Sequence, residues 1–237
     1  MTKYVPAWAL GALTLLGSLF VVLALIAQHA ATGTALDHAV LDAMIHHRHP
    51  ALTWWAIAVT EIGSPVGVGA LTLLCSAVLW RRLASPWPAL VVVGAVAGAG
   101  ILSTAIKIIV GAHRPPLSVQ LITETDPSFP SGHVTGTLAL LGALTAVLGH
   151  HRRTPARAVL LALTAAGAVT VALTRLYLGV HWVSDVAGGL LLGALAAIGA
   201  HLVYRYVAHR TDGSTGSSSL MPEPGRTVDT EPEHTTR

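Results

Sequence analysis

Charged residues are scarce in this sequence: Asp, Glu, Lys and Arg together make up 11% of its 237 residues. Soluble domains usually carry about a quarter, so this scarcity excludes an ordinary water-soluble protein. Hydrophobic residues make up 53% of the chain, and the mean hydropathy is +0.65. Such a composition is typical of an integral membrane protein.

Cysteine is almost absent, since Cys75 is the one cysteine of the chain. A single Cys excludes an intramolecular disulfide and any metal site built on several Cys ligands. Basic residues outnumber acidic ones by 14 to 11, and the sequence pI is about 9.4. The cations are spread among loops rather than gathered on one face, which argues against a nucleic-acid partner.

The sequence contains several long stretches of apolar residues. A transmembrane helix needs roughly 20 apolar residues to cross a hydrocarbon core about 30 Å thick. The sequence contains about six such stretches, near residues 7–27, 66–80, 89–110, 134–148, 158–178 and 183–207. It therefore predicts an all-α fold, a polytopic membrane bundle of about six transmembrane helices.

The first stretch follows Lys3 and could be a secretory signal peptide. Its run of about 20 apolar residues exceeds the roughly 7–15 of a signal peptide, which favours an uncleaved first helix. Residues 34–61 contain Pro50 and several charges. They are expected to form helices at the membrane interface, with Trp54 and Trp55 at the headgroup level.

The last part of the chain has a different composition. Residues 211–237 are rich in Thr, Ser, Gly, Pro and Glu and contain almost nothing apolar. This composition predicts a disordered tail. Residues 1–210 are accordingly expected to form one transmembrane domain.

Loop charges predict the orientation of the bundle, because loops rich in Lys and Arg usually face the cytoplasm. If the six helices alternate in direction, one side carries Lys3, Arg81, Arg82, Arg152, Arg153, Arg157, Arg205 and Arg210. That side is predicted to be cytoplasmic, with both chain termini and the tail on it. The opposite side carries only Arg48, Lys107, Arg114 and Arg175, and the last three belong to short motifs.

These motifs occupy residues 107–115, 130–133 and 174–185. In an alternating six-helix bundle, all three fall at the extracytoplasmic ends of helices. A helix count that was wrong by one would place them on opposite sides of the membrane. Their convergence therefore supports both the count and a shared site.

The cations of the motifs are suited to binding phosphate. Arg114 and Arg175 present planar forks that bind pairs of phosphate oxygens, and Lys107 adds a point charge. Lys107 lies two helical turns before Arg114, so both are expected on one helix face, with Pro115 ending that helix. Taken alone, Lys107 and Arg114 could equally be interfacial residues that reach the headgroups.

The second and third motifs supply histidines. Ser131 is a suitable N-cap for the next helix, and Gly132 allows a ligand to approach its backbone N–H groups. His181 and Asp185 lie four residues apart, so Asp185 can hold one imidazole nitrogen as N–H and leave the other with a lone pair. By themselves, these features would also fit an ordinary helix start with an incidental His133 and a surface His–Asp pair.

Taken in order, the three motifs resemble the signature of the type 2 phosphatidic acid phosphatases, the PAP2 superfamily, which includes lipid phosphate phosphatases and vanadium haloperoxidases. That signature is Lys, six residues, Arg-Pro; then Pro-Ser-Gly-His; then Ser-Arg, five residues, His, three residues, Asp. Every spacing matches, and Thr174 replaces the usual Ser with another hydroxyl residue. The resemblance covers about residues 107–185 and implies a PAP2-like catalytic core.

The resemblance also implies residue roles. His181 would be the nucleophile that forms a phosphohistidine intermediate, with Asp185 orienting it. His133 would protonate the leaving oxygen and then activate water. The phosphate-binding residues would be Lys107, Arg114, Ser131, Gly132 and Arg175. No metal or cofactor is implied.

The predicted substrate is a lipid phosphate, because the motif residues lie at helix ends beside the headgroups. The motifs specify the phosphate and not the lipid tail. Several substrates therefore fit: phosphatidic acid, phosphatidylglycerophosphate, undecaprenyl diphosphate and sphingoid phosphates. A lipid phosphotransferase with the same intermediate is the alternative enzyme. A non-catalytic membrane transporter or scaffold is the alternative of another class. The sequence does not determine the oligomeric state.

Other polar and small residues are interpreted as structural or solvated. The loop histidines, for which solvation fits better than a metal site, are His46, His47, His49, His150 and His151. Glu124 and Asp126 are expected to keep an outer loop soluble rather than to line the site. The pairs Gly94/Gly98 and Gly189/Gly193 are expected to allow close helix packing rather than to define a dimer.

Overall fold

The structure is a computed structural model that describes residues 6–217, with side chains described through residue 210. Within this range the chain forms eight α-helices and one short 3-10 helix. In chain order they are α1 (Ala7–His29), α2 (Ala35–His46), α3 (Pro50–Ile62), α4 (Pro65–Leu83), α5 (Trp87–Val110), η2 (Leu117–Val119), α6 (Gly132–Leu148), α7 (Thr154–Tyr177) and α8 (Val183–Ser217).

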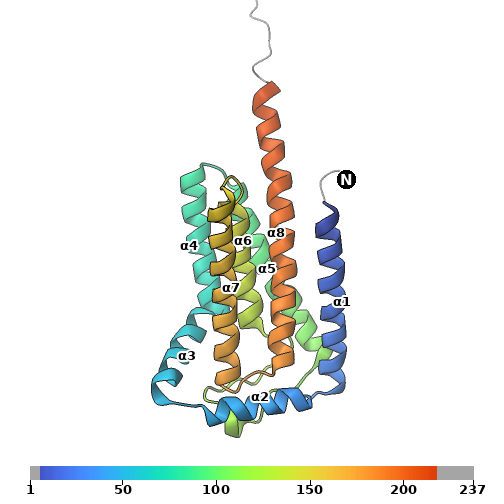
Figure 1. Ribbon diagram of the computed structural model, residues 1–237. Helices are drawn as coiled ribbons and strands as arrows, with labels where there is room; N and C mark the ends of the chain where they lie inside the picture. The colour runs from blue at the N-terminus through green and yellow to red at the C-terminus, as the bar shows by residue number, and fades with distance from the viewer. Residues whose placement is uncertain (1–5, 218–237) are drawn as a thin grey trace, which may run out of the picture.

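Six long helices run side by side along a common axis, and α2 lies across one end of the bundle (Figure 1). Five of them, α1, α4, α5, α7 and α8, are long and apolar enough to cross a membrane. The sixth, α6, is also apolar but has 17 residues. The predicted all-α transmembrane bundle is confirmed, and each predicted stretch corresponds to one of these six helices.

Helix α6 forms the middle of the bundle and packs most extensively on α8. Two glycines of α8 make this contact close. A Cβ atom at Gly193 would lie 2.7 Å from the Cβ of Leu138, and one at Gly189 would lie 2.8 Å from the carbonyl oxygen of Ser131. Close packing at Gly189 and Gly193 is therefore confirmed, and it holds the start of α6 against the first turns of α8.

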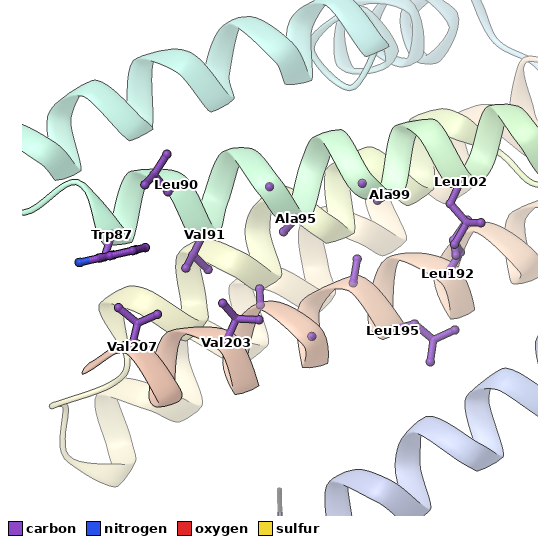
Figure 2. A pocket seen from close by; sticks show the side chains of 15 residues that line it. Trp87, Leu90, Val91, Ala95, Ala99, Leu102, Leu192, Leu195, Val203 and Val207 are labelled. Atoms are coloured by element: carbon purple, nitrogen blue, oxygen red, sulfur yellow. The ribbon is translucent and has the colours of Figure 1, made fainter. Parts of the chain in front are cut away.

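The glycines of α5 are placed differently. A Cβ atom at Gly94 or Gly98 would contact no atom within 4 Å, so the expectation of close packing at this pair is wrong. Both residues line a groove of about 510 Å³ between α5 and α8. Figure 2 shows the apolar walls of this groove, with Trp87 toward one end and Leu102 toward the other.

The outer surface of the bundle is apolar. Large hydrophobic side chains that are more than half exposed occur on α1, α4, α5 and α7, among them Leu15, Leu73, Ile101 and Leu163. Contiguous exposed apolar surface is rare on soluble proteins. It is the surface that a bilayer covers.

Residues 34–61, expected at the membrane interface, form α2 and α3. Helix α2 begins with a capping box, in which the Asp37 N–H donates to Thr34 Oγ1 at 3.2 Å and the Thr34 N–H donates to Asp37 Oδ2 at 2.8 Å. Pro50 is the first residue of α3, where its missing N–H is not needed. Trp54 and Trp55 of α3 are 77% and 49% exposed, as suits an aromatic belt.

The two ends of the bundle carry different residues. The start of α1 and the far part of α8 lie at the end opposite α2 (Figure 1). Arg81 and Arg82 in the last turn of α4 lie at that end too. The three motifs lie at the α2 end, because they follow α5 and α7 and precede α6 and α8.

Helix α5 ends where the predicted apolar stretch 89–110 ends, and the expectation that it continues to Pro115 is wrong. It stops at Val110, and not at Pro115, because Gly111 adopts a left-handed backbone with φ 62°. The Gly111 N–H then donates to the carbonyl of Lys107 at 3.0 Å and caps the helix. Arg114 therefore lies in the following loop and not on a helix face with Lys107.

Helix α8 is longer than the sequence predicts. It continues to Ser217, past the end of the membrane domain expected at residue 210. The rest of the predicted tail, residues 218–237, lies outside the described residues.

Candidate active site

The three motifs meet at the α2 end of the bundle. The end of α5 and its loop carry the first, the start of α6 carries the second, and the end of α7 with the start of α8 carries the third. Backbone hydrogen bonds join them: Ser131 N–H donates to the carbonyl of Asp185 at 3.0 Å, and Leu121 N–H donates to the carbonyl of Leu178 at 2.9 Å. Segments far apart in the sequence thus form one site.

His181 and Asp185 form a buried pair at the start of α8. His181 Nδ1 lies 3.2 Å from Asp185 Oδ2, and both side chains are 1% exposed. The carboxylate also accepts hydrogen bonds from the Trp182 N–H at 2.9 Å and from the Ser128 hydroxyl at 3.1 Å. These donors fix the carboxylate, which in turn holds the imidazole in one orientation.

The contacts of His181 assign the hydrogen on its ring. Nε2 lies 3.1 Å from Nη1 of Arg114, and a guanidinium can only donate, whereas the carboxylate beside Nδ1 accepts. The neutral ring therefore carries its hydrogen on Nδ1 and presents the lone pair of Nε2 to Arg114. Burial, followed by the charges of Arg114, Arg175 and Lys107, holds the pKa of His181 well below its ordinary value. The ring is accordingly neutral.

Contacts outside the motifs position the start of α8. The Asp37 carboxylate of α2 accepts hydrogen bonds from the Ser184 N–H at 2.9 Å and the Ser184 hydroxyl at 3.2 Å. Trp182 donates from Nε1 to the carbonyl of His113 at 2.7 Å. Its ring covers Gly33, where φ is 95° and a Cβ atom would approach the ring to 3.1 Å. Helix α2 and the loop before it therefore hold the start of α8 in place.

Arg114 is held on several sides by the loop around it. It donates from Nε to the carbonyl of Asp126 at 2.8 Å and from Nη1 to the carbonyl of Val180 at 2.7 Å. Nη2 contacts the Asp126 carboxylate at 2.6 Å, and the Arg114 side chain is 7% exposed. These bonds direct the guanidinium toward Nε2 of His181.

Arg175 is fully buried at the end of α7. Nη1 donates to Thr60 Oγ1 at 2.8 Å, and Nη2 contacts Glu124 Oε1 at 2.6 Å. The second oxygen of Glu124 lies 3.5 Å from Nη2 of Arg114, so one carboxylate bridges the two arginines. Nε of Arg175 is buried and has no hydrogen-bond partner among the described residues, so its N–H is available to a ligand.

Lys107 completes the group of cations. Its Nζ lies 2.9 Å from Asp126 Oδ2 and donates to the carbonyl of Pro127. Burial is the largest single effect on Asp126 and opposes its ionisation, but hydrogen bonds and charges from Lys107 and Arg114 together outweigh it. The pKa of Asp126 therefore lies below its ordinary value. The ionised carboxylate bridges Lys107 and Arg114.

Glu124 and Asp126 are thus part of the site, and their interpretation as residues that merely keep the loop soluble is wrong. Each bridges two of the three motif cations, with side-chain exposures of 23% and 51%. Arginine binds carboxylate and phosphate oxygens with the same fork geometry. The two carboxylates therefore compete with any phosphate for the same donors.

The start of α6 borders the same cations. Ser131 occupies the N-cap position, but its side chain makes no cap hydrogen bond, and its Oγ is buried without a partner in the described part of the chain. A Cβ atom at Gly132 would meet no atom within 4 Å, so there is room at a helix start that favours anions. His133, in the first turn, lies within electrostatic range of all three motif cations.

Arg48, the outer cation that belongs to no motif, has a structural position. It donates from Nη2 to the carbonyls of Val119 at 2.7 Å and Tyr177 at 3.3 Å. These bonds tie η2 to the end of α7. Arg48 therefore stabilises the loop that carries the acidic residues.

The contacts of the loop histidines are mostly local. His46 and His47 of α2 each bond through Nδ1 to a backbone carbonyl of their own helix, at 2.7 Å. The rings of His150 and His151 contact each other at the far end of the bundle. Within residues 6–210, whose side chains are described, no group of three or more His, Cys, Asp or Glu residues is placed to hold a metal ion.

Comparison with known families and proteins gives consistent matches. A family model described as the PAP2 superfamily matches residues 88–210, more than half of the chain and a range that contains all three motifs. Over 179 residues the chain is 27% identical to phosphatidylglycerophosphatase B of Bacillus subtilis, covering 75% of this chain and 87% of that protein. Over 85 residues it is 38% identical to YbjG of Escherichia coli, named as a candidate undecaprenyl-diphosphatase, but that match spans 36% of this chain and 39% of the relative.

The fold has a close counterpart among solved structures. The crystal structure of a transmembrane PAP2-type phosphatidylglycerolphosphate phosphatase from Bacillus subtilis superposes with a TM-score of 0.74 at 25% sequence identity. The superposition covers 83% of this chain and 96% of that one. The arrangement of helices is therefore shared along nearly the whole length of that protein.

Proposed function

The chain belongs to the PAP2 superfamily, and on that basis we propose that it is a membrane lipid phosphate phosphatase that works through a phosphohistidine intermediate. Phosphatidylglycerophosphatase B of Bacillus subtilis, which aligns with most of this chain, is by name a phosphatase that acts on a lipid phosphate. The apolar helices place the protein in a membrane. Both observations support a lipid as the substrate.

One observation carries the proposal: three cations gather around a neutral histidine whose Nε2 lone pair faces one of them, Arg114. A phosphoryl group in transfer spreads its charge over three equatorial oxygens, and fixed cations stabilise that charge. Arg114 lies 3.1 Å from His181 Nε2. Arg175 and Lys107 each share a carboxylate partner with Arg114. A transporter or scaffold has no need of an oriented, buried His–Asp pair.

In the first step we assign Nε2 of His181 as the nucleophile. It attacks phosphorus, a bond forms between nitrogen and phosphorus, and the bond from phosphorus to the lipid oxygen breaks. The negative charge of the bound phosphate favours protonation of His133 against the surrounding cations. The protonated His133 then gives its proton to the leaving oxygen, so the lipid leaves as an alcohol, or as a monophosphate if the substrate is a diphosphate. Asp185 stabilises the positive charge on the His181 ring.

In the second step water attacks the phosphohistidine. His133, now neutral, takes a proton from the water, a bond forms between the water oxygen and phosphorus, and the bond to His181 Nε2 breaks. Inorganic phosphate leaves, and both histidines return to their starting states. We assign the buried Ser131 hydroxyl and the N–H groups at the start of α6 to binding of the phosphate oxygens, which the unpartnered Ser131 Oγ supports.

A purified-protein assay tests the activity. The full chain in detergent is given phosphatidic acid, phosphatidylglycerophosphate and undecaprenyl diphosphate, and released phosphate is measured. Phosphate release from at least one of them is expected. Transfer of the phosphoryl group to an added alcohol, without release to water, would instead identify a lipid phosphotransferase. No turnover of any of them would leave a transporter or scaffold as the better account.

Activity is expected to survive EDTA, because Lys107, Arg114 and Arg175 supply the positive charge that the mechanism needs. Vanadate is expected to inhibit more tightly than phosphate, since its five-coordinate form resembles the transferring phosphoryl group. Initial rates with EDTA and with graded vanadate measure both effects. Loss of activity in EDTA that Mg²⁺ restores would contradict this mechanism.

Neutralising Glu124 is expected to strengthen anion binding. In Glu124→Gln the amide competes less well for Arg175 and Arg114, so the inhibition constant of vanadate should fall about two- to fivefold, the worth of a partly exposed ion pair. Asp42→Asn makes the same charge change on α2, away from the cations, and serves as the control. Weaker vanadate inhibition in Glu124→Gln would show that Glu124 helps to bind the anion rather than competing with it.

We propose that the phosphatase domain spans residues 1–210, with both termini in the cytoplasm and the active site on the extracytoplasmic face. The loop Arg residues at the end opposite α2 support this orientation. In a Cys75→Ala background, a cysteine introduced by Ser118→Cys should react with a membrane-impermeant thiol reagent in intact cells. One introduced by Thr154→Cys should react only after the cells are opened. The reverse labelling would place hydrolysis at the cytoplasmic face.

A further inference from the structure

A second cavity lies toward the end of the bundle opposite the active site. Its volume is about 1020 Å³, and it lies between α7 and α8, with parts of α6 and Trp8 of α1 as further walls. Helix α7 packs well on α6 but only sparsely on α8, which leaves this space. Along α8 the lining extends from Leu190 to His209, a length of roughly 28 Å at 1.5 Å per residue.

The part of the cavity nearest the middle of the bundle is apolar. Its walls there include Leu138, Ala168, Val169, Leu190 and Leu191. The two hydroxyls in the wall, Thr145 and Thr164, hydrogen-bond to each other at 2.7 Å. This part of the cavity therefore suits a hydrocarbon chain.

The mouth of the cavity is basic. Arg157 of α7 and His201, Arg205 and His209 of α8 line it, with His150 from the turn between α6 and α7. Between residue 127 and residue 210, the last residue with a described side chain, Asp185 is the only acidic residue. Asp185 is bound to the His181 ring at the opposite end of α8. Neither Arg157 nor Arg205 forms an ion pair with a residue whose side chain is described, so the mouth of the cavity suits an anionic group.

The groove between α5 and α8 provides a contrast within the same molecule. It is lined throughout by apolar and glycine residues (Figure 2) and carries no charged side chain. Any lipid tail could lie there, and nothing in it selects a headgroup. The larger cavity between α7 and α8, by contrast, combines an apolar channel with a cationic mouth.

We propose that the cavity between α7 and α8 is a binding site for an anionic phospholipid of the leaflet at that end of the bundle. One acyl chain lies between the helices, and the headgroup phosphate contacts Arg157 and Arg205. Basic pockets between transmembrane helices bind anionic headgroups in this way. The site is separate from the active site, since Asp185 and His209 are roughly 36 Å apart along α8 at 1.5 Å per residue.

Native mass spectrometry of the purified full chain tests the proposal. The protein is equilibrated with equimolar phosphatidylglycerol and phosphatidylcholine in detergent, and the retained lipids are counted. Phosphatidylglycerol should be retained about tenfold over phosphatidylcholine. The double variant Arg157→Gln/Arg205→Gln should lose that preference, as expected for two arginines at an anionic headgroup. Arg81→Gln/Arg82→Gln removes the same charge at the same end, outside the cavity, and should keep the preference.

A second pair of variants tests the apolar part. Ala165 lines the cavity, whereas Ala162 is exposed on the same helix and does not. Ala165→Phe should reduce retained phosphatidylglycerol severalfold, and Ala162→Phe should not. Because phosphatidylglycerol could also enter the active site, the measurement is repeated with Arg114→Gln. Retention in that variant should match the unmodified protein.

Four results would overturn the proposal. Equal retention of the two lipids would remove the headgroup preference, and equal loss in both arginine pairs would show a diffuse surface charge. Displacement of the lipid by glycerophosphate at a similar concentration would identify a site for free phosphate. A dimer that Ala165→Phe disrupts in the absence of lipid would identify a second copy of the chain as the occupant.

Discussion

Replacing His181 by Ala is expected to abolish both turnover and covalent labelling by substrate phosphate. His181 combines an Nδ1 bound to Asp185 at 3.2 Å with an Nε2 facing Arg114 at 3.1 Å. The rate should fall by about 10⁵–10⁶, the order seen when an enzyme loses its nucleophile. Released phosphate and acid-labile protein-bound phosphate are the two measurements.

Two further variants separate chemistry from packing, because His181 is buried. His181→Gln keeps most of the volume and a hydrogen-bonding end, and it should be as inactive as His181→Ala. His29→Ala makes the same deletion at the exposed end of α1, where the ring bonds to the Leu25 carbonyl of its own helix, and it should remain active. Acid-labile label that persists in His181→Ala would place the nucleophile elsewhere.

The second large effect is expected at His133. Its replacement by Ala should lower the rate by about 10²–10⁴, the usual worth of a general acid or base. The loss in forming the intermediate should shrink with a good leaving group such as p-nitrophenolate, since that oxygen needs no proton. Burst amplitude and steady-state rate, compared for alkyl and nitrophenyl phosphates, measure this dependence.

The leaving-group dependence decides between two roles for His133. A residue that only binds phosphate would slow all substrates by the same factor. Equal losses for alkyl and nitrophenyl phosphates would therefore contradict general acid catalysis. His133 would then join the three cations as a phosphate-binding residue.

The sequence predicted the helices and the family well, because both depend on local signals. Apolar stretches of membrane-spanning length have few alternative structures, and the six predicted stretches match α1, α4, α5, α6, α7 and α8. The motif spacings do not depend on how the loops fold. The PAP2 resemblance is therefore confirmed by the family match over residues 88–210.

Contacts made by loop residues could not be predicted in the same way. An acidic residue in a polar loop has the same sequence context whether it is solvated or bound, so nothing distinguished Glu124 and Asp126 as partners of the motif cations. Pro115 is a strong helix-breaking signal, so the sequence predicted that it would end α5. The helix ends earlier in the chain, because Gly111 adopts a left-handed backbone directly after Val110. Glycine commonly follows the last residue of a helix. If Gly111 had been taken as that signal in place of Pro115, Arg114 would have been predicted in the loop.

Residues that position the site were missed for a similar reason. Asp37 shows a sequence signal, the Thr34-to-Asp37 capping box, but its bonds to Ser184 depend on how α2 packs against α8. Ser128 supports Asp185 across the fold and has no signal of its own. Long-range partners of this kind are set by tertiary structure, which a local pattern does not contain.

The most direct test of the central claim is a rapid-quench experiment with a phosphate-labelled lipid substrate. The purified protein is mixed with substrate, quenched in alkali within one turnover, digested, and mapped by mass spectrometry. Phosphate should be found on His181, should form before inorganic phosphate, and should decay at the rate of turnover. Turnover without protein-bound phosphate at any time, or phosphate on a different residue, would contradict the proposed mechanism.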